Sequence, residues 1–313
     1  MKDRYAYLNG FTFDDCLVRS SSIIGFTAQK WPDSDPLEQR HTAVFFYYPK
    51  KSKERQWAVV SVGHAAGIHG CAVTSPAERW VFLMDDGEVY VVGKGDNDYE
   101  KPIDRKPDMY FSNVKSVRNG WAYAVGPRRK VYVRRNAGGW TQLDAGLFPQ
   151  GSNTDLRNAG FRDIDGFDDK DIYACGGRGD LWHYDGNVWM NVDVPTNADL
   201  QNICCAEDGL VYITTGTNGI LRGRDATWEL IEQDVSDDIL EAIVDFNGKV
   251  IVSTIPELYY LDGDELKVFE PKKPKMNSRA HLAAGDGVLV VAGDDEATMY
   301  DGKSWSVILD PVP

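Results

Sequence analysis

The residues that could carry chemistry in this 313-residue chain do not form a recognisable catalytic or metal-binding set. His64 and His69 could serve as metal ligands, but a lasting site needs three or four converging ligands and the chain has only five histidines. The run 163–169 contains four aspartates, yet it lacks the spacing and closing glutamate of an EF-hand. We expect solvated turns there, and we predict neither a metal nor a cofactor.

Hydrolase chemistry would need a different set of residues. A sialidase-like enzyme would need clustered arginines, a tyrosine nucleophile and an acidic acid/base residue. Arg128, Arg178 and Arg279 fall in predicted loops, but no spacing singles them out. The sequence also contains no Gly-x-Ser-x-Gly elbow and no Cys-x-x-Cys motif. We therefore predict no catalytic residues, and a hydrolase or lyase acting on an anionic sugar remains the alternative from the enzyme class.

The charge of the chain bears on its partners. Its 34 lysines and arginines against 48 aspartates and glutamates give a formal net charge of -14, which argues against a nucleic-acid ligand. The balance is uneven, because residues 101–135 hold ten basic side chains and only two acidic ones. No apolar run approaches the roughly 18 residues of a membrane-spanning helix. The five cysteines show no paired spacing, so we expect reduced thiols and a cytoplasmic location.

Internal repeats indicate which elements must position these residues. Five segments share one layout of strand, turn, strand, turn and strand, and they cover residues 120–143, 171–192, 210–231, 249–270 and 288–309. Their runs of valine, isoleucine, tyrosine and tryptophan are bounded by glycine, aspartate and asparagine, which is typical of short strands. A period near 40 residues predicts units that bury their apolar faces only against each other.

A large residue after the last turn marks the phase of each repeat, at intervals of 38 to 49 residues. The seven markers are Trp57, Tyr99, Trp140, Trp189, Trp228, Leu266 and Trp305. Short apolar segments ahead of each core, such as 114–117 and 161–164, can supply a fourth strand. The prediction is an all-β fold, a seven-bladed β-propeller with four-stranded antiparallel blades in a single domain of residues 1–313. The approximate blades are 9–63, 64–106, 107–148, 149–195, 196–235, 236–274 and 275–313.

Two turns carry a family resemblance. The pattern Tyr-Asp-Gly-x-x-Trp occurs at 184–189 and 300–305, and an Asp-Gly pair in such a hairpin supplies the positive φ angles of a tight turn. This pattern resembles the Asp-box-like repeats of bacterial propellers related to sialidases and to photosystem II assembly factors. The resemblance implies a fold and leaves the function open.

Propellers usually bind ligands on one face, which is built from the loops between the second and third strands of each blade and from the blade-to-blade connections. We call this the loop face. Our predicted partner-binding residues on it are His64, Asp85, Asp86, Arg128, Arg129, Arg178, Asn218, Glu257, Asp294 and Asp295. Arginines lie on blades 3 and 4, and carboxylates on blades 2, 6 and 7. Such a polarised rim suits a protein partner with its own charge pattern. We expect His69 on the inner strand of blade 2, facing the central channel.

The function that these features predict is protein binding without catalysis. The acidic, single-domain chain with no active site suggests an immunity protein that binds and neutralises a cognate bacterial toxin, a basic one in the sharpest version, because acidic inhibitors associate rapidly with cationic targets. An assembly or maturation factor is the alternative within the binding class. We expect a monomer with no nucleic-acid or membrane partner.

Overall fold

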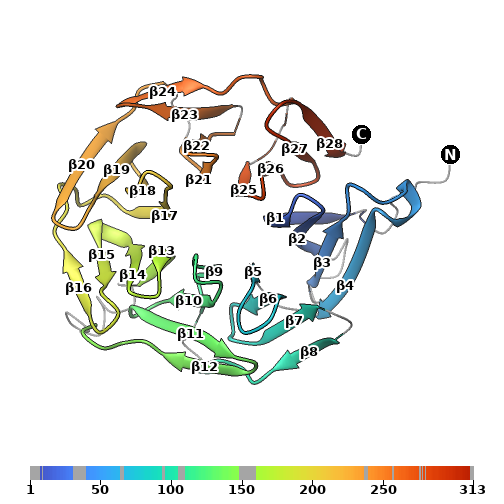
Figure 1. The fold of residues 1–313 in the computed structure, drawn as a ribbon, viewed down its shortest axis with the longest axis horizontal. Coiled ribbons are helices and arrows are strands. Elements are labelled where there is room, and N and C mark those ends of the chain that lie inside the picture. The colour runs from blue at the N-terminus through green and yellow to red at the C-terminus, as the bar shows by residue number, and fades with distance from the viewer. Residues whose placement is uncertain are drawn as a thin grey trace.

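The computed structural model is a closed ring of seven four-stranded antiparallel sheets around a central axis (Figure 1). This confirms the predicted seven-bladed β-propeller. The structure describes residues 8, 10–30, 40–63, 67–93, 96–104, 110–147, 160–235, 239–255, 257–274, 276, 278 and 280–310. Within that part, no helix is long and apolar enough to cross a membrane.

The strands of each blade follow one another in the chain. Blade 1 consists of β1 (Phe11–Ser20), β2 (Ile23–Lys30), β3 (His41–Tyr47) and β4 (Trp57–Gly63). Blade 2 consists of β5 (Ile68–Val73), β6 (Arg79–Met84), β7 (Val89–Gly93) and β8 (Asp96–Glu100). Blade 3 consists of β9 (Asn113–Ser116), β10 (Ala122–Gly126), β11 (Lys130–Asn136) and β12 (Gly139–Gln142). Blade 4 consists of β13 (Phe161–Asp168), β14 (Asp171–Gly176), β15 (Leu181–Tyr184) and β16 (Trp189–Val192).

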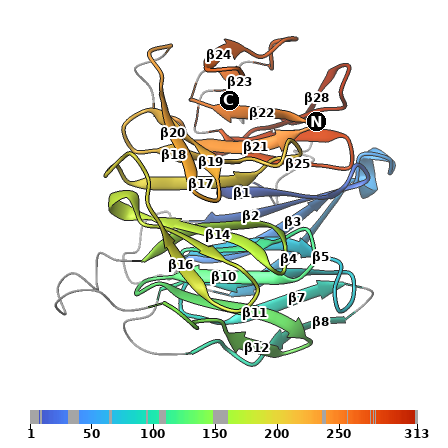
Figure 2. The ribbon, with the colours of Figure 1, turned by 60° about the vertical axis from the view of Figure 1, so that its left-hand side comes forward.

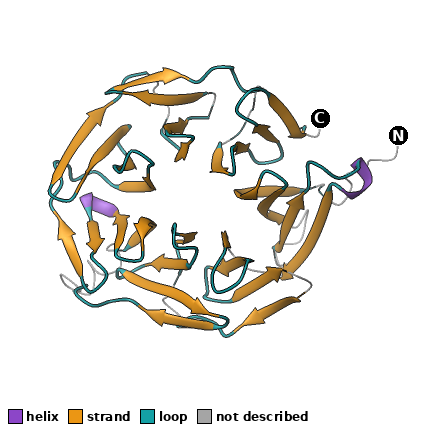
Figure 3. Cartoon of the chain, in the orientation of Figure 1, coloured by secondary structure: helices purple, strands orange, loops and turns teal. Residues whose placement is uncertain are grey.

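The other three blades have the same plan. Blade 5 consists of β17 (Leu200–Cys205), β18 (Val211–Thr215), β19 (Gly219–Arg224) and β20 (Thr227–Glu232). Blade 6 consists of β21 (Ala242–Phe246), β22 (Lys249–Ser253), β23 (Leu258–Asp262) and β24 (Glu265–Val268). Blade 7 consists of β25 (His281–Gly285), β26 (Val288–Ala292), β27 (Ala297–Tyr300) and β28 (Trp305–Leu309). Two short 3₁₀ turns, η1 (Lys53–Arg55) and η2 (Gly177–Gly179), complete the described elements (Figure 3).

Burial explains the strand patterns. The second strand of a blade is covered by both neighbouring blades, so β18 and β26 are buried at every position and read as continuous apolar or small residues. The outermost strands face solvent on one side, and Val307 in β28 is 46% exposed. Each hydrophobic cluster therefore forms where two sheets pack face to face.

All seven marker residues lie on the outermost strand of their blade, which confirms the repeat phase. Three of the markers also tie neighbouring blades together. The hydroxyl of Tyr99 in blade 2 donates to the carbonyl of Val62 in blade 1 over 2.5 Å. The indole Nε1 of Trp189 donates to the carbonyl of Leu143, and that of Trp305 donates to the carbonyl of Pro271. Each acceptor belongs to the end of the preceding blade, so the aromatic side chain packs at a blade junction and satisfies its polar atom there.

The ring closes by packing between blade 1 and blade 7, where β1 and β25 lie side by side (Figures 1 and 2). The amide of Phe13 donates to the carbonyl of Asp294 over 2.6 Å, and the amide of Ser21 donates to the Asp286 carboxylate over 2.7 Å. Each of these two blades is built from its own four consecutive strands. Residues 4–8 could add a strand beside blade 7, but only Leu8 of this segment lies within the described residues.

Candidate partner-binding face

The antiparallel strand order places the predicted site residues on one face. In every blade the loop between the second and third strands opens on the same side as the connection to the next blade. Arg128 and Arg129 lie between β10 and β11, Arg178 lies in η2, and Asn218 lies between β18 and β19. His64 falls outside the described residues.

The acidic members of the set lie on the same face. Asp85 and Asp86 follow β6, Glu257 precedes β23, and Asp294 and Asp295 follow β26. Burial raises the pKa of Asp85 above its ordinary value. Carboxylates therefore occupy blades 2, 6 and 7, and arginines occupy blades 3 and 4, as the sequence indicated. Their role in binding a partner remains a prediction.

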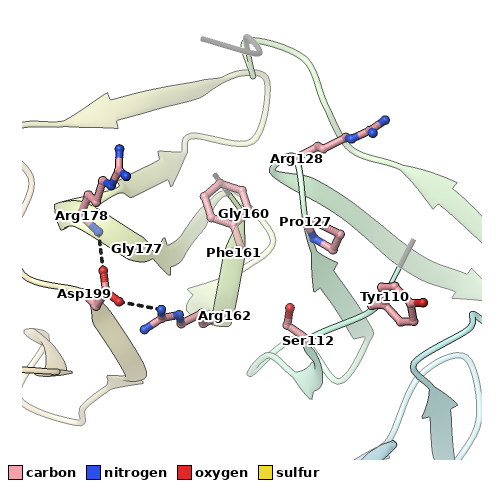
Figure 4. A pocket seen from close by; sticks show the side chains of 10 residues that line it. All are labelled: Tyr110, Ser112, Pro127, Arg128, Gly160, Phe161, Arg162, Gly177, Arg178 and Asp199. Atoms are coloured by element: carbon pink, nitrogen blue, oxygen red, sulfur yellow. Dashed lines mark hydrogen bonds and ion pairs between the residues drawn. The ribbon is translucent and has the colours of Figure 1, made fainter. Parts of the chain in front are cut away.

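A cavity of about 670 Å³ opens on the loop face between blades 3 and 4 (Figure 4). We call it the arginine pocket. Its lining includes Arg128, Arg162 and Arg178, with Asp199 as the only carboxylate among the described lining residues. Phe161 lines it too and is itself only 1% exposed. The two loop arginines were predicted from the sequence, but Arg162 was not, because it resembles any polar residue of an inner strand.

Close backbone approach shapes this pocket. Gly160 pairs with Pro127 in an isolated bridge, and a Cβ at position 160 would lie 2.7 Å from the Cα of Pro127. A side chain at that position would push the two blades apart. Arg128 and Arg178 occupy equivalent loop positions, and both have left-handed backbones with φ of 59° and 61°. Non-glycine residues are uncommon in that region, and such strained positions cluster at binding sites.

Asp199 is already engaged within the pocket. Its Oδ2 accepts from Nη2 of Arg162 over 2.7 Å, and its Oδ1 accepts from the backbone amide of Arg178 over 3.0 Å (Figure 4). The amide of Arg178 and the guanidinium of Arg162 lower the pKa of Asp199. The carboxylate is therefore ionised at neutral pH and fixes the loop, while the side chains of Arg128 and Arg178 extend from the rim and are exposed.

Arg129 is held by the neighbouring blade. Its Nε and Nη2 donate to the two oxygens of Asp180 over 2.7 and 2.9 Å, and its guanidinium lies over the ring of Trp182. The side chains of Arg129 and Asp180 are only 12% and 10% exposed. A bidentate pair of this kind fixes the geometry of both loops. Arg129 therefore positions the neighbouring loop of blade 4, a role that its type and place in the sequence did not distinguish from that of Arg128.

The central channel forms a second cavity, of about 700 Å³, lined by the beginnings of the inner strands. His69 lies on β5 and lines this cavity, as expected. Burial lowers its pKa to about 4, against an opposing effect of Asp163. Burial also raises the pKa of Asp14 to about 6 and that of Asp15 to about 7. The channel thus favours neutral forms of several groups that ordinarily carry charge.

The expectation of solvated turns at 163–169 is wrong for Asp163 and Asp165, which lie on the inner strand β13. Asp163 accepts from Nζ of Lys115 over 3.0 Å and from the amide of Ile203 over 2.9 Å. Asp165 accepts from the amide of Cys205 over 2.9 Å. The periodic position of both aspartates lets each bind a backbone amide of the next blade. These hydrogen bonds hold blades 4 and 5 together, and they account for both aspartates without a metal ion.

Lys115 completes this network. Its Nζ also donates to the carbonyl of Ile203 over 2.7 Å. Burial alone would lower the pKa of Lys115, but the carboxylates of Asp163 and Asp165 outweigh that effect and raise it. Its charge is thus compensated inside the channel. Among the described residues, no group of three or more His, Cys, Asp or Glu side chains is arranged to hold a metal ion.

A known protein is similar to this chain over most of its length. No family model matches the chain. The immune protein Tsi7 of Pseudomonas aeruginosa is 35% identical over 256 residues, which are 80% of this chain and 80% of Tsi7. The chain belongs to the Tsi7 family. The hypothesis of an immunity protein on a propeller scaffold is thereby confirmed at the level of the family. The charged residues of the loop face described above are therefore those of one member of the Tsi7 family.

Solved structures agree on the fold. The WD40 β-propeller domain of Doa1 has a TM-score of 0.62 at 12% identity and covers 91% of this chain and 94% of its own. Virginiamycin B lyase from Staphylococcus aureus has a TM-score of 0.56 at 13% identity, covering 77% and 87%. YCF48 bound to the D1 peptide has a TM-score of 0.51 at 13% identity, covering 73% and 77%. At such identities the likeness shows the propeller fold alone.

Proposed function

We propose that this chain is a non-enzymatic immunity protein whose loop face binds a cognate bacterial protein toxin and blocks it. The observation that carries the proposal is the 35% identity to an immune protein over 80% of both chains. The structure supports it with a rigid ring whose loop face presents exposed charged side chains from several blades. A preorganised face of this kind loses little conformational entropy on binding.

The charge supports a basic toxin. A formal net charge of -14 attracts a cationic protein at long range and accelerates association. The carboxylates on blades 2, 6 and 7 then face the partner directly, while the arginines of blades 3 and 4 orient it. The protein acts in the cytoplasm as a monomer. The Asp-box-like turns at 184–189 and 300–305 serve the scaffold, as a degenerate form of that repeat.

Affinity capture from the organism's own cells tests the proposal. The tagged chain is used at low and at moderate salt, and bound proteins are identified by mass spectrometry. A single stoichiometric basic protein is expected, which arrests growth when produced alone and is harmless when this chain is co-produced. Light scattering should give a one-to-one complex and a monomeric free chain. A clean bait at both salt concentrations would contradict the proposal, and capture of a housekeeping complex would indicate an assembly factor.

A second candidate is an enzyme acting on an anionic sugar at the channel mouth. The observation that favours it is Asp14, whose Oδ2 is buried without a hydrogen-bond partner in the described part of the chain. Its raised pKa, about 6, suits a general acid. Thermal-shift screening with acidic sugars distinguishes the two functions, because stabilisation that is lost in D14N would favour the enzyme.

A further inference from the structure

We propose that the mouth of the central channel receives a basic side chain of the toxin, a lysine or arginine whose charge is held by the carboxylates of Asp14 and Asp15. This inference rests on the proposed function and adds the chemistry of one contact. The ion pair of Lys115 and Asp163 in the same channel remains part of the scaffold.

A β-bulge brings the two carboxylates into one cavity. In β1, Phe13 pairs with Ala28 and Asp15 pairs with Thr27, so Asp14 is an extra residue of the strand. Successive side chains of a regular strand point to opposite faces, whereas a bulge redirects one of them. Asp14 and Asp15 accordingly both line the channel cavity of about 700 Å³. They lie at the loop-face end of the channel, where the inner strands begin (Figure 1).

Asp14 is an acceptor that the described residues do not satisfy. Its Oδ2 is buried and accepts no hydrogen bond within that part of the chain. Asp15 accepts at Oδ1 from the amide of Cys16, the next residue of its own strand, and no described side chain donates to either carboxylate. A buried oxygen without a donor costs free energy, and an incoming ammonium or guanidinium would supply that donor.

Blade 4 contains the same kind of bulge with its charges paired. In β13 the pairing register shifts between Phe161 and Asp163, so Arg162 is the extra residue there. Arg162 donates to Asp199, and Asp163 accepts from Lys115. The two bulges therefore differ in use, because blade 4 pairs its charged residues with the scaffold and blade 1 leaves its carboxylates for a ligand.

The charges around the two carboxylates set the pH at which a cation binds. Burial raises the pKa of Asp14 to about 6, with a smaller opposing effect of Arg40 and a further increase from Asp294. Burial raises the pKa of Asp15 to about 7, although Lys115 opposes it. A bound cation stabilises the charged forms, so it should bind more tightly as pH rises past these values. The other ionisable side chains of the described cavity lining are His69, Arg162, Asp163, Glu241 and His281.

The apolar part of the lining suits the stem of a long basic side chain. Ile243 and Leu282 line the same cavity on blades 6 and 7 and are 4% and 8% exposed. The strand that carries Leu282, β25, packs beside β1. Lysine and arginine bury their methylene groups on apolar surface and bring the charged end to polar partners. The cavity thus offers both surfaces that such a side chain needs.

Other ligands fit the channel mouth less well. Among the described residues, no three or more His, Cys, Asp or Glu side chains are arranged to hold a metal ion. An anionic ligand would face two carboxylates and would raise their pKa values further. A basic side chain agrees in sign with the long-range attraction that a net charge of -14 exerts on a cationic toxin.

A peptide titration tests the channel mouth without the toxin. The probes are acetyl-Gly-Lys-Gly-amide and acetyl-Gly-Arg-Gly-amide, with acetyl-Gly-Gln-Gly-amide as the neutral counterpart. Binding is followed by NMR at about 0.15 M salt, where surface charges beyond about 8 Å are screened. At about pH 8 we expect one or both basic peptides to bind at least about tenfold more tightly than the neutral one. Equal affinities of all three peptides would overturn the proposal.

Paired variants locate the site. D14N/D15N removes both charges with little change of shape and should weaken binding of the basic peptide at least about tenfold. The control D262N/E265Q removes two exposed charges beside the turn between β23 and β24, on the opposite face. It matches the change in net charge and should bind as the unaltered protein does. Thermal unfolding checks that both variants fold, and D14N and D15N are measured singly if the double variant does not. Unchanged binding by the folded variants contradicts the proposal.

The pH dependence of binding is a second readout. The pKa values of about 6 for Asp14 and about 7 for Asp15 predict that protonation removes the charges as pH falls. The affinity of the unaltered protein for the basic peptide should therefore decrease at least about tenfold between pH 8 and pH 5. In D14N/D15N it should change far less, although His281 is still present to titrate. The same decrease in that variant would assign the effect to another group and refute this site.

The outcome for immunity is separate. If affinity capture finds no toxin, the proposed function fails whatever the peptides do. If a toxin is captured, D14N/D15N should raise its dissociation rate at least about tenfold, as expected for loss of a charged contact at an interface, and D262N/E265Q should not. A toxin complex that is unaffected by D14N/D15N would overturn the basic anchor and leave the immunity function standing.

Discussion

The central channel and the arginine pocket are both rich in charged side chains, but they use them in different ways. In the channel, Lys115 is compensated by Asp163, and Asp163 in turn binds backbone of the next blade. In the pocket, Asp199 is compensated by Arg162, while the side chains of Arg128 and Arg178 are exposed at the rim. One set of charges holds the ring together and the other is presented outward.

In this propeller, the burial of a charged side chain, more than its residue type, decides whether it stabilises the fold or is presented at the surface. The side chain of Asp163 is 4% exposed, so its negative charge must be compensated within the protein. Charged side chains at the surface contribute little to stability, because water and salt screen their interactions. Substitutions of paired charges in the channel should therefore reduce stability, and substitutions at the pocket rim should reduce binding. The predictions below would break or sharpen that division.

The largest effect is expected for D163A. It leaves Lys115 half-buried without its carboxylate and frees the amide of Ile203, so the free energy of unfolding should fall by about 4 kcal/mol. Urea denaturation measures it. The control is D262A, which removes the exposed partner of Lys267 and should leave the urea midpoint unchanged. A loss in D163A below about 1 kcal/mol would mean that the channel charges are as dispensable as surface ones.

Adjacent arginines should then behave differently. R129A breaks the buried pair with Asp180, and it should lower the free energy of unfolding by about 3 kcal/mol. R128A, one residue earlier in the same loop, should change it by no more than about 0.5 kcal/mol. Thermal and urea unfolding of both variants provide the measurement. Equal losses would show that the rim arginines are also part of the scaffold.

The salt dependence of binding distinguishes long-range attraction by the net negative charge from short-range contacts at the arginine pocket. Raising salt from about 0.05 M to about 0.5 M should slow association with a captured basic toxin about tenfold, because long-range attraction is screened. The dissociation rate should change less, since it depends on desolvated contacts. Surface plasmon resonance measures both rates. Association that becomes faster with salt would indicate a partner that is acidic overall.

The smallest effect is expected in the pH dependence of stability that His69 contributes. Its pKa is lowered to about 4 in the folded protein, so the neutral form is favoured and this contribution to stability is lost as pH falls from 6.5 toward 4. Asp14 and Asp15 have raised pKa values and act in the opposite direction, gaining stability as pH falls below about 7. In H69Q only the histidine contribution disappears.

The stability of H69Q relative to the unaltered protein should therefore rise between pH 7 and pH 5. Chemical denaturation at several pH values measures the difference, in which the carboxylates common to both proteins cancel. Parallel stability curves for the two proteins would mean that His69 is as easily protonated in the channel as in water.

Most of the architecture was predictable because it is written in repeats. The seven markers and the Asp-Gly turns recur at regular intervals, and each blade buries its apolar faces against the next. The loop positions of Arg128 and Arg178 followed from that register. The roles of Asp163 and Asp165 did not follow, because a cluster of aspartates looks like a solvated turn until the neighbouring blade supplies the amides that it binds.

By itself the sequence determined the number of blades, the face on which each loop opens, the net charge and the absence of a catalytic motif, because these depend on periodicity and residue type along one chain. Only the tertiary structure decided which charged side chains are paired within the scaffold and which are exposed at the surface. Arg128 and Arg129 are neighbours of the same type, but Asp180, 51 residues away, reaches only one of them. That choice depends on distance and burial between blades, which no single stretch of sequence contains.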